Sequence, residues 1–350
     1  MTEREAVLRR HGYHALPVKQ VVYETEEARS FVLEVPDELR PTFAYRPGQF
    51  CSVRIHVGEA VVARCYSMSS APEVEGDLTF TVKRVPGGSV SNWLVDHLAA
   101  GTLIEVNPPS GNFCVGEGSR PIVAFCAGSG MTPVLSIAKS VLATSSRPVS
   151  LLYANRDRGS VIFRQRLDEL QAQFPGRFDV LHHLDLEAGF VDPAVVADFV
   201  GGRVEAEFFI CGPGPFMDVV EETLLDVGVG PQAMAIERFE TTVGPETTPS
   251  PETAGADGPE SIVLILQGKK HQIDYHAGDT VLEAARRANV ATPSSCEAGN
   301  CATCMAQVLE GTVTMRVNDA LSPEEVDDGW VLTCQSRPVG SSLTVEFEAL

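Results

Sequence analysis

Basic residues are scarce in this 350-residue chain, which has 27 Lys and Arg against 47 Asp and Glu, a formal net charge of −20. Nucleic-acid binding depends on Lys and Arg side chains that neutralise phosphates, so this composition argues against a nucleic-acid partner. The acidic surface could steer a basic docking partner, or it could simply keep the protein soluble. The sequence leaves both interpretations open.

Long apolar segments are also missing. No run approaches the roughly 18 apolar residues that a membrane-spanning helix needs. The first residues, MTEREAVLRRHGYHALPV, contain no apolar core of the kind found in secretory signals. We therefore expect a soluble cytoplasmic protein without a membrane partner, in a reducing compartment where thiolate ligands survive.

Histidine is absent around the densest group of cysteines, and only one C-x2-C pair occurs there. Structural zinc sites usually combine two such pairs, or one pair with histidines, so zinc is the weaker alternative. The spacing C-x4-C-x2-C-x29-C is instead that of a plant-type [2Fe-2S] cluster, in which four thiolates hold two irons. We predict four metal ligands: Cys296, Cys301, Cys304 and Cys334. The other five cysteines stand singly and form no disulfide framework: Cys51, Cys65, Cys114, Cys126 and Cys211.

Composition divides the chain into a polar lead-in (1–15) and four further parts. Residues 16–117 contain short β-rich runs separated by Pro and Gly, typical of a small antiparallel barrel. Residues 118–242 alternate buried strands with amphipathic helices, which predicts a parallel α/β sheet. Residues 243–259 are rich in Pro, Thr, Gly and acid, as flexible linkers are. Residues 260–350 predict an α+β module of the β-grasp type, so we expect a multidomain protein.

Local patterns predict individual elements within these parts. Helical patterns occur at 91–98, 161–174 and 280–288. In the last module, strand patterns occur at 306–311, 312–315 and 343–349.

An Arg-x-Tyr-Ser run ends an apolar strand of the β-rich part. Arg64 could pair with a pyrophosphate, the Tyr66 ring could stack on a planar cofactor, and the Ser67 hydroxyl could reach a ring nitrogen. Ordinary strand packing is the simpler explanation for a tyrosine at this place.

A glycine-rich turn follows before a helix, with Gly88, Ser89 and Ser91. Such turns expose N–H groups at a helix N-terminus and bind phosphate. The alternative is that Ser91 caps the helix. Together, the turn and the Arg-x-Tyr-Ser run favour a bound dinucleotide flavin.

Two further turns follow strands of the α/β part. The first is G-x-G-x-x-P, with Gly128, Ser129, Gly130 and Pro133, and it departs from the usual G-x-G-x-x-G. Its glycines still permit close approach to a pyrophosphate, and Pro suits a first helical turn. The second turn contains Cys211, Gly212 and Pro213, at a strand end where open α/β sheets bind ligands. A buried structural thiol is the alternative for Cys211.

The runs R-x-Y-S, GGSVS, AGSGMTP and CGPGP, in this order, resemble the ferredoxin–NADP⁺ reductase superfamily. With the C-terminal cysteine group, the chain resembles the subgroup built from flavin, nicotinamide and iron–sulfur domains, over residues 16–348. The runs YANRD, VIFR and ICGPGPFMD are most similar to reductase components of 3-ketosteroid 9α-hydroxylases, with phenylacetyl-CoA epoxidase reductases as near relatives. G-x-G-x-x-P is the usual turn of this family.

The resemblance implies a role for each motif. Ser67, near flavin N5, and Cys211, beside the path from the nicotinamide to the flavin, would be catalytic. Phe239 would lie over the flavin, and Thr132 would lie on the flavin side of the nicotinamide turn. FAD would be held by Arg64, Tyr66, Gly88, Ser89 and Ser91, and NAD(P)H by Gly128, Ser129, Gly130, Pro133, Gly212 and Pro213.

The resemblance also implies a function. Electrons would pass from NAD(P)H to FAD, then singly to the [2Fe-2S] cluster, and then to a terminal oxygenase, first among them the Rieske oxygenase of 3-ketosteroid 9α-hydroxylation. The reductase of an epoxidase or another ring-hydroxylating oxygenase is one alternative, and a non-catalytic redox sensor is another. Asp157 could suit the ribose of NADH and Arg156 the 2′-phosphate of NADPH. The resemblance favours NADH.

Overall fold

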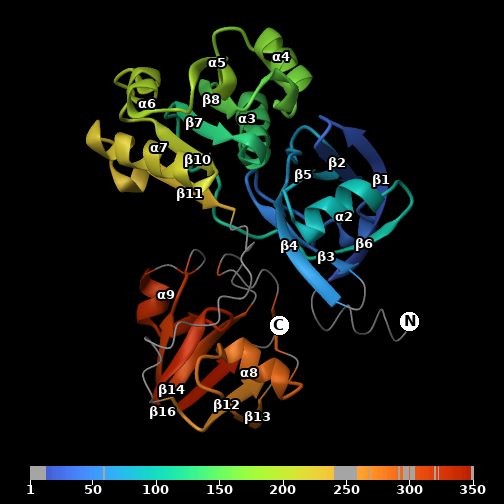
Figure 1. Ribbon diagram of the computed structural model, residues 1–350, viewed down its shortest axis with the longest axis vertical. Helices are drawn as coiled ribbons and strands as arrows, with labels where there is room; N and C mark the ends of the chain where they lie inside the picture. Colours follow the sequence, from blue (N-terminus) through green and yellow to red (C-terminus); the bar gives the residue numbers. More distant parts are fainter. Residues whose placement is uncertain are drawn as a thin grey trace. The chain divides into compact units, whose positions relative to one another are not determined.

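The computed structural model describes residues 13–57, 60–239, 258–266, 268–290, 292–294, 299, 304–318, 321 and 323–347 (Figure 1). The chain forms two compact units, one of His14–Thr241 and one of Thr242–Leu350 with Met1–Tyr13. Most of the predicted linker, residues 243–257, lies outside the described residues, as do residues 1–12 of the predicted lead-in.

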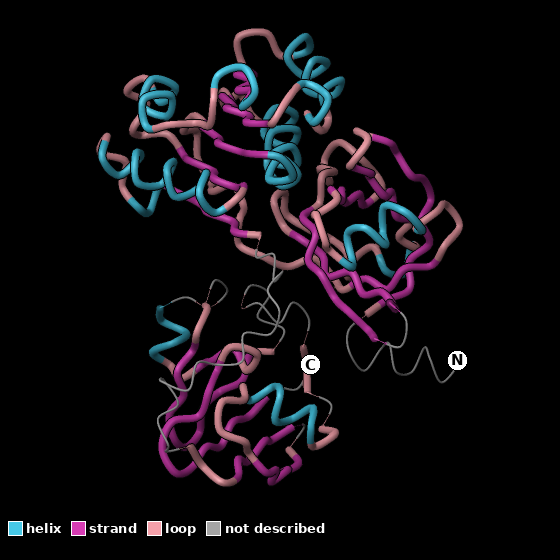
Figure 2. The backbone as a smooth tube through the Cα atoms, viewed as in Figure 1, coloured by secondary structure: helices cyan, strands magenta, loops and turns pink. Residues whose placement is uncertain are grey.

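The β-rich half of the first unit is a closed antiparallel barrel (Figure 2). Its strands follow the order β4-β3-β6-β1-β2-β5, and a bridge between Met68 and Phe80 joins the two outer strands. Phe31 and Phe80 belong to the apolar cluster that fills the interior of the barrel. The strands are β1 (His14–Tyr23), β2 (Ala28–Leu33), β3 (Phe50–Val57), β4 (Ala60–Ser67), β5 (Leu78–Lys83) and β6 (Leu103–Val106), with a short 3-10 turn η1 (Asp37–Leu39).

Helix α2 (Ser89–His97) packs on this barrel through Val90 and Leu94. It begins two residues before the predicted start, because Gly88 rather than Ser91 takes the N-cap position. The Ser91 hydroxyl instead accepts a hydrogen bond from the Val85 N–H at 3.1 Å. The capping interpretation of Ser91 is therefore wrong, since its side chain closes the preceding turn.

The other half of the first unit is a five-stranded parallel sheet in the order β11-β10-β7-β8-β9. Helices α3 and α4 cover one face and α6 and α7 the other, each with its own apolar cluster (Figure 1). The direction of winding reverses between β7 and β10, the place where open α/β sheets bind ligands. The elements are β7 (Ile122–Ala127), η2 (Gly128–Gly130), α3 (Met131–Thr144), β8 (Val149–Asn155), η3 (Arg158–Ser160), α4 (Arg164–Gln173), β9 (Phe178–Leu184), α5 (Asp185–Ala188), α6 (Pro193–Val200), β10 (Glu207–Gly212), α7 (Gly214–Asp226), η4 (Pro231–Ala233) and β11 (Met234–Arg238).

Helix α4 is shorter than the predicted helix over 161–174. Phe163 takes the left-handed backbone conformation with φ of 60°, and the helix begins only at Arg164. Val161, in an extended conformation, and Ile162, in a turn, are buried in the α3–α4 cluster. Their apolar side chains pack in the core and do not form a helical turn. Hydrophobic periodicity alone does not distinguish these two cases.

The C-terminal unit is a mixed sheet crossed by one helix, as predicted for a β-grasp module. The strands follow the order β13-β12-β16-β14-β15, in which only β12 and β16 run parallel. Helix α8 packs on the sheet through Val281 and Ala285, and Thr280 and Glu283 form its capping box. The elements are β12 (Ser261–Leu266), β13 (Lys269–Asp274), α8 (Val281–Arg287), β14 (Met305–Met315), α9 (Pro323–Asp327), β15 (Trp330–Leu332) and β16 (Ser336–Phe347).

Two predictions for this unit are wrong in extent. The two strands expected at 306–311 and 312–315 are one strand, β14, because register shifts at Val308/Glu310 and Gly311/Thr312 absorb the glycine. Strand β16 begins at Ser336, seven residues before the predicted Leu343, and passes through Gly340. Glycine in a strand marks a local irregularity here, not its end.

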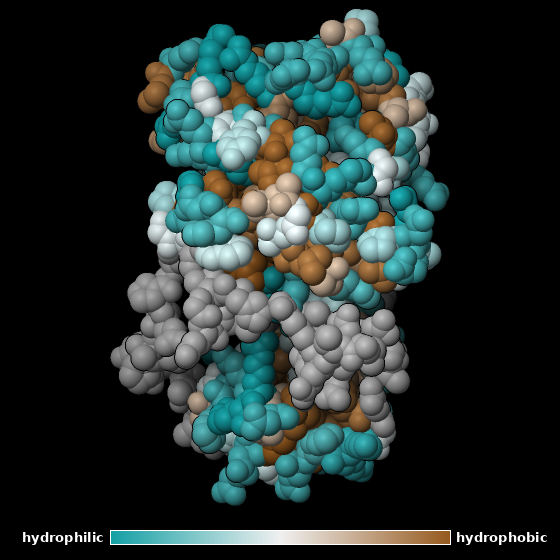
Figure 3. All heavy atoms as spheres, turned by 90° about the vertical axis from the view of Figure 1, so that its right-hand side faces the viewer, coloured by the Kyte–Doolittle hydropathy of each residue, from teal (hydrophilic) through white to brown (hydrophobic). Residues whose placement is uncertain are grey.

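The predicted combination of antiparallel barrel, parallel α/β sheet and α+β module is thus confirmed. Hydrophilic side chains cover much of the barrel side of the first unit, with apolar side chains scattered between them (Figure 3). Among the described residues, none of the helices is long and apolar enough to cross a membrane.

A buried ion pair fastens the segment that joins the barrel to the sheet. Arg147 and Glu207 meet at 2.5 Å, with side chains 5% and 11% exposed. Glu207 also accepts the Gly116 N–H at 2.7 Å, and Arg147 donates to the Arg120 carbonyl at 2.6 Å. Both ends of the connecting segment are therefore held by one pair of side chains.

We predict that Glu207→Ala lowers the free energy of unfolding by about 3–5 kcal/mol, because it leaves the Arg147 guanidinium buried without its carboxylate. Urea denaturation followed by circular dichroism measures the change. The control is Asp37→Ala, which removes an exposed ion pair with Arg40 and should leave the transition unchanged. Equal effects of the two substitutions would contradict the assignment.

Candidate functional site

The two glycine turns meet at the carboxyl ends of β7 and β10. These strands are neighbours, with Cys126 and Cys211 in register. A Cβ placed on Gly130 would lie 2.1 Å from the Cys211 carbonyl oxygen, and one on Gly212 would lie 3.0 Å from the Ala127 Cβ. Larger residues at Gly130 or Gly212 would force the turns apart, so the glycines are required by the approach of one strand end to the other.

A cavity of about 910 Å³ lies over these turns, between the sheet and the barrel. Of the predicted nicotinamide residues, Gly128, Ser129, Gly212 and Pro213 line it, together with Phe239. The barrel contributes Lys83, whose Nζ lies 3.5 Å from the position of a Cβ on Gly128. Backbone N–H groups and a cation at one turn are what a pyrophosphate requires.

Gly130, Thr132 and Pro133 do not line this cavity. Thr132 is 2% exposed, and its hydroxyl donates to the Ser129 carbonyl at 3.0 Å. Pro133 is buried in the first turn of α3. These residues support the turn but do not line the cavity.

Arg156 and Asp157, the two candidates for nucleotide choice, are paired with each other at 2.8 Å. The Asp157 carboxylate also accepts the Ser160 N–H at 2.9 Å and caps η3. Asp157 is therefore committed to its own turn. Arg156 lines the cavity, but its charge is balanced by its neighbour.

The Arg-x-Tyr-Ser run lies at the carboxyl end of β4, with Arg64 exposed and Tyr66 partly buried. The Tyr66 ring lies 5.5 Å from the Phe80 ring, at an interplanar angle of 32°. Burial raises the pKa of the Tyr66 phenol, so this group stays neutral. A neutral ring backed by a second ring is suited to stacking on a flat cofactor.

The glycine-rich turn before α2 offers its first N–H groups without a capping side chain, since the N-cap residue is Gly88. A Cβ on Gly88 would lie 2.8 Å from the Ser91 hydroxyl oxygen. Ser91 is 7% exposed and accepts from Val85, and a hydroxyl that accepts can still donate. The Ser89 side chain lies outside the described structure.

Ser67, Cys211 and Glu237 converge from the barrel and the sheet. The Ser67 hydroxyl donates to Glu237 Oε2 at 2.9 Å, and Cys211 pairs in register with Glu237 across β10 and β11. Burial raises the pKa of the Glu237 carboxyl to about 8, and burial with the nearby Glu237 raises the pKa of the Cys211 thiol. At neutral pH the group therefore holds protons on the carboxyl and on the thiol.

Glu237 was missing from the sequence prediction. The signal that could have found it is a carboxylate inside the apolar strand AMAIERF, two residues before Phe239. A titratable group with a shifted pKa often marks a functional site. The partner that makes it informative, Ser67, lies 170 positions earlier in the chain.

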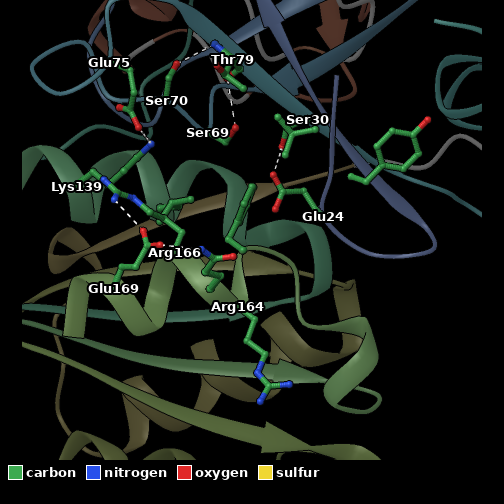
Figure 4. Close-up of a pocket in the computed structure, with 15 residues that line it drawn as sticks. Glu24, Ser30, Ser69, Ser70, Glu75, Thr79, Lys139, Arg164, Arg166 and Glu169 are labelled. Carbon is green, nitrogen blue, oxygen red and sulfur yellow. Dashed lines mark hydrogen bonds and ion pairs between the residues drawn. The ribbon is translucent and has the colours of Figure 1, made fainter. Parts of the chain in front are cut away.

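A second cavity, of about 560 Å³, lies between the barrel and helices α3 and α4 (Figure 4). Lys139, 5% exposed, points into an ion pair with Glu75, and burial lowers the pKa of Lys139. Two contacts of 2.8 Å link the hydroxyl groups of Ser69, Thr81 and Ser30, and the Ser30 hydroxyl donates to Glu24 Oε1 at 2.6 Å. Two ion pairs, Lys139 with Glu75 and Arg166 with Glu169, lie at this cavity, which contains none of the predicted site residues.

Two of the predicted cluster ligands are described. Cys304 and Cys334 are 2% and 7% exposed and belong to an apolar cluster with Leu282, Leu321 and Leu332. Pairing of Met305 with Leu332 brings the two cysteines to one end of β14 and β15, and the Thr333 hydroxyl donates to the Cys304 carbonyl at 2.9 Å. Soft sulfur donors in a dry setting fit an iron–sulfur cluster. Cys296 and Cys301 lie outside the described residues.

Family models match three successive parts of the chain. An oxidoreductase FAD-binding domain matches residues 15–114, an oxidoreductase NAD-binding domain matches 125–222, and a 2Fe-2S iron-sulfur cluster binding domain matches 264–339. The chain thus contains FAD-binding, NAD-binding and [2Fe-2S] domains in that order.

The chain is similar to named relatives over nearly their whole length. The chain is 40% identical to the ferredoxin reductase component of 3-ketosteroid-9-alpha-monooxygenase from Rhodococcus rhodochrous, over 96% of this chain and 98% of that protein. It is 32% identical to a component of the 1,2-phenylacetyl-CoA epoxidase from Escherichia coli K12, with the same coverage of 96% and 98%. Phthalate dioxygenase reductase has the same fold, with a TM-score of 0.62, 24% identity, and 97% and 99% of the two chains covered.

The raised pKa of Glu237 predicts a dependence of stability on pH. Below about pH 4.5 the Glu237 carboxyl is protonated in both the folded and the unfolded chain. Between about pH 4.5 and pH 8 only the folded chain keeps this proton. The contribution of Glu237 to stability therefore falls as the pH rises through this range. Glu237→Gln abolishes this titration. The free energy of unfolding of Glu237→Gln, relative to that of the wild type, should therefore increase by at most about 4 kcal/mol as the pH rises from 5 to 8.

Urea denaturation at pH 5, 6, 7 and 8 measures this difference. The matched control is Glu222→Gln, on the exposed face of α7, whose curve should stay parallel to that of the wild type. A Glu237→Gln curve that is also parallel would show that the carboxyl titrates in its ordinary range.

Proposed function

The chain belongs to the family of oxygenase reductases that carry FAD-binding, NAD-binding and [2Fe-2S] domains in one polypeptide, and from this premise we propose that it supplies the Rieske oxygenase of 3-ketosteroid 9α-hydroxylation with electrons from NADH. The observation that carries the proposal is the 40% identity to the steroid-monooxygenase reductase over nearly all of both chains, against 32% to the epoxidase component. We also propose the domain limits predicted from composition: 16–117 for the FAD domain, 118–242 for the nicotinamide domain, 243–259 for the linker and 260–350 for the [2Fe-2S] domain.

When bound, FAD accepts a hydride and gives up single electrons, and the [2Fe-2S] cluster carries one electron at a time. The protein supplies position and proton control. We assign the N–H groups of the Gly128 and Gly212 turns, with Lys83, to the pyrophosphate of the nicotinamide nucleotide. Arg64 and the first turn of α2 are assigned to FAD phosphates, and the Tyr66 ring to its flat ring system.

Ser67 and Glu237 are proposed to hold the proton that accompanies hydride transfer. Their hydrogen bond of 2.9 Å links a hydroxyl on the barrel to a carboxyl on the sheet. Because the pKa of Glu237 lies at about 8, the carboxyl can take up or release a proton close to neutral pH. Cys211, kept as a thiol by burial, contributes shape and weak polarity beside this pair.

NADH is proposed as the donor over NADPH. The 2′-phosphate of NADPH requires a cation whose charge is not already balanced, and Arg156 is paired with Asp157. Comparison of kcat/KM for the two nucleotides tests this assignment, with a higher value expected for NADH.

We expect Cys304→Ser to leave flavin reduction by NADH intact and to abolish electron delivery to the oxygenase, because Cys304 is a proposed cluster ligand. Stopped-flow bleaching of the flavin and oxygenase turnover measure the two steps separately. Cys114→Ser, which alters a partly exposed cysteine that follows the barrel, serves as the control and should support turnover. Normal turnover by Cys304→Ser would refute the scheme.

The oxygenase itself is identified by reconstitution. The purified protein, NADH, a steroid-ring Rieske oxygenase and 4-androstene-3,17-dione should give hydroxylated steroid, with the epoxidase and phenylacetyl-CoA run in parallel. Product only in the second mixture would assign the chain to the epoxidase. Absence of product in both, together with no reduction of cytochrome c, would favour the redox sensor.

A further inference from the structure

Gln335 follows the proposed ligand Cys334 in the turn between β15 and β16, and its side chain faces the sulfur. The Gln335 Nε2 amide donates to Cys334 Sγ at 3.7 Å, an ordinary length for a contact to sulfur. Gln335 is 2% exposed, so water does not compete for this amide. The contact therefore joins a buried donor to a buried sulfur.

The orientation of the amide is fixed from its other end. Arg316 Nε donates to Gln335 Oε1 at 3.3 Å, which leaves the NH₂ group for the sulfur. The backbone is tied as well, because the Arg316 N–H donates to the Gln335 carbonyl at 3.0 Å and the Gln335 N–H to the Leu332 carbonyl at 2.9 Å. Gln335 is thus held in place by contacts that do not depend on Cys334.

Gly299 lies close to the same side chain. In the sequence it stands between Cys296 and Cys301, its φ is 87°, and a Cβ there would approach Gln335 Cγ to 3.2 Å. Gln335 is therefore close both to Arg316, which follows β14, and to Gly299. Its contacts extend beyond Cys334, its neighbour in the sequence.

A hydrogen bond to a ligand sulfur acts on the two redox states differently. Reduction adds one electron to the pair of irons and makes the thiolates more negative, so a donor at the sulfur stabilises the reduced state more than the oxidised state. The apolar neighbours Leu282, Leu321 and Leu332 strengthen this effect, because a low local dielectric enhances a charge-assisted hydrogen bond.

We propose that Gln335 is a positioning residue that raises the reduction potential of the cluster by donating its amide N–H to the Cys334 thiolate. The single electron that leaves the reduced flavin then enters the cluster more favourably. The proposal rests on the assignment of Cys334 as a cluster ligand, which is part of the proposed function. Gln335 would thus favour electron flow from the flavin to the cluster.

The test is Gln335→Met in the full-length protein, since methionine is of similar length and lacks the donor. The equilibrium constant for cluster reduction should fall about tenfold, which is a potential lower by 59 mV for a one-electron couple. A redox titration followed by electron paramagnetic resonance measures it. Gln272→Met, on an exposed face of β13, is the matched control and should leave the potential unchanged.

A second variant guards against a disturbed fold. Gln335→Glu keeps the shape and the contact with Arg316 but replaces the donor by an oxygen, so its potential should lie below that of Gln335→Met. Potentials equal to that of the wild type in both variants, with the cluster spectrum intact, would overturn the inference. A Cys334→Ser variant that keeps a complete plant-type spectrum would instead overturn the ligand assignment on which the inference rests.

Discussion

The structure of the first unit depends on how closely the ends of β7 and β10 can approach. A side chain at Gly130 would collide with the Cys211 carbonyl, and one at Gly212 would collide with Ala127 and Phe216. With glycine at both positions the two turns come close together, and Gly128, Ser129, Gly212 and Pro213 line one cavity. Cys211 is then held beside Glu237 by strand register alone. The cavity over the two turns therefore depends on one steric constraint.

The barrel must also stay in a fixed position relative to this sheet, because Ser67 is on one and Glu237 on the other. Three kinds of contact provide that. The Ser136 hydroxyl donates to the Ser70 carbonyl at 2.5 Å, Lys139 pairs with Glu75, and Arg147 with Glu207 holds the connecting segment. The Ser136 and Lys139 side chains would each lose a partner if the two halves separated, which makes the relative placement of the halves specific as well as stable.

The sequence predicted those features in which local chemistry dictates the residues. The cysteine spacing identified the iron–sulfur module, and strand–turn–helix patterns placed the turns at Gly128 and Gly212. Contacts between distant segments were not predictable. The importance of Glu237 is apparent only from its hydrogen bond with Ser67 on the barrel, and the Asp157 carboxylate caps η3. The extents of α4, β14 and β16 were missed because Phe163 adopts a left-handed conformation and Gly311 and Gly340 are accommodated within paired strands.

Cys211 and Cys334 show that burial alone does not decide what a thiol can do. Both side chains are nearly inaccessible, at 0% and 7% exposure. Cys211 faces a carboxyl group, and burial keeps its proton in place, which suits a group that only shapes a reaction site. Cys334 faces an amide donor held by Arg316, the surroundings that a negatively charged sulfur needs in an apolar environment. The direction of the nearest dipole, more than depth in the core, distinguishes the surroundings of Cys334 from those of Cys211.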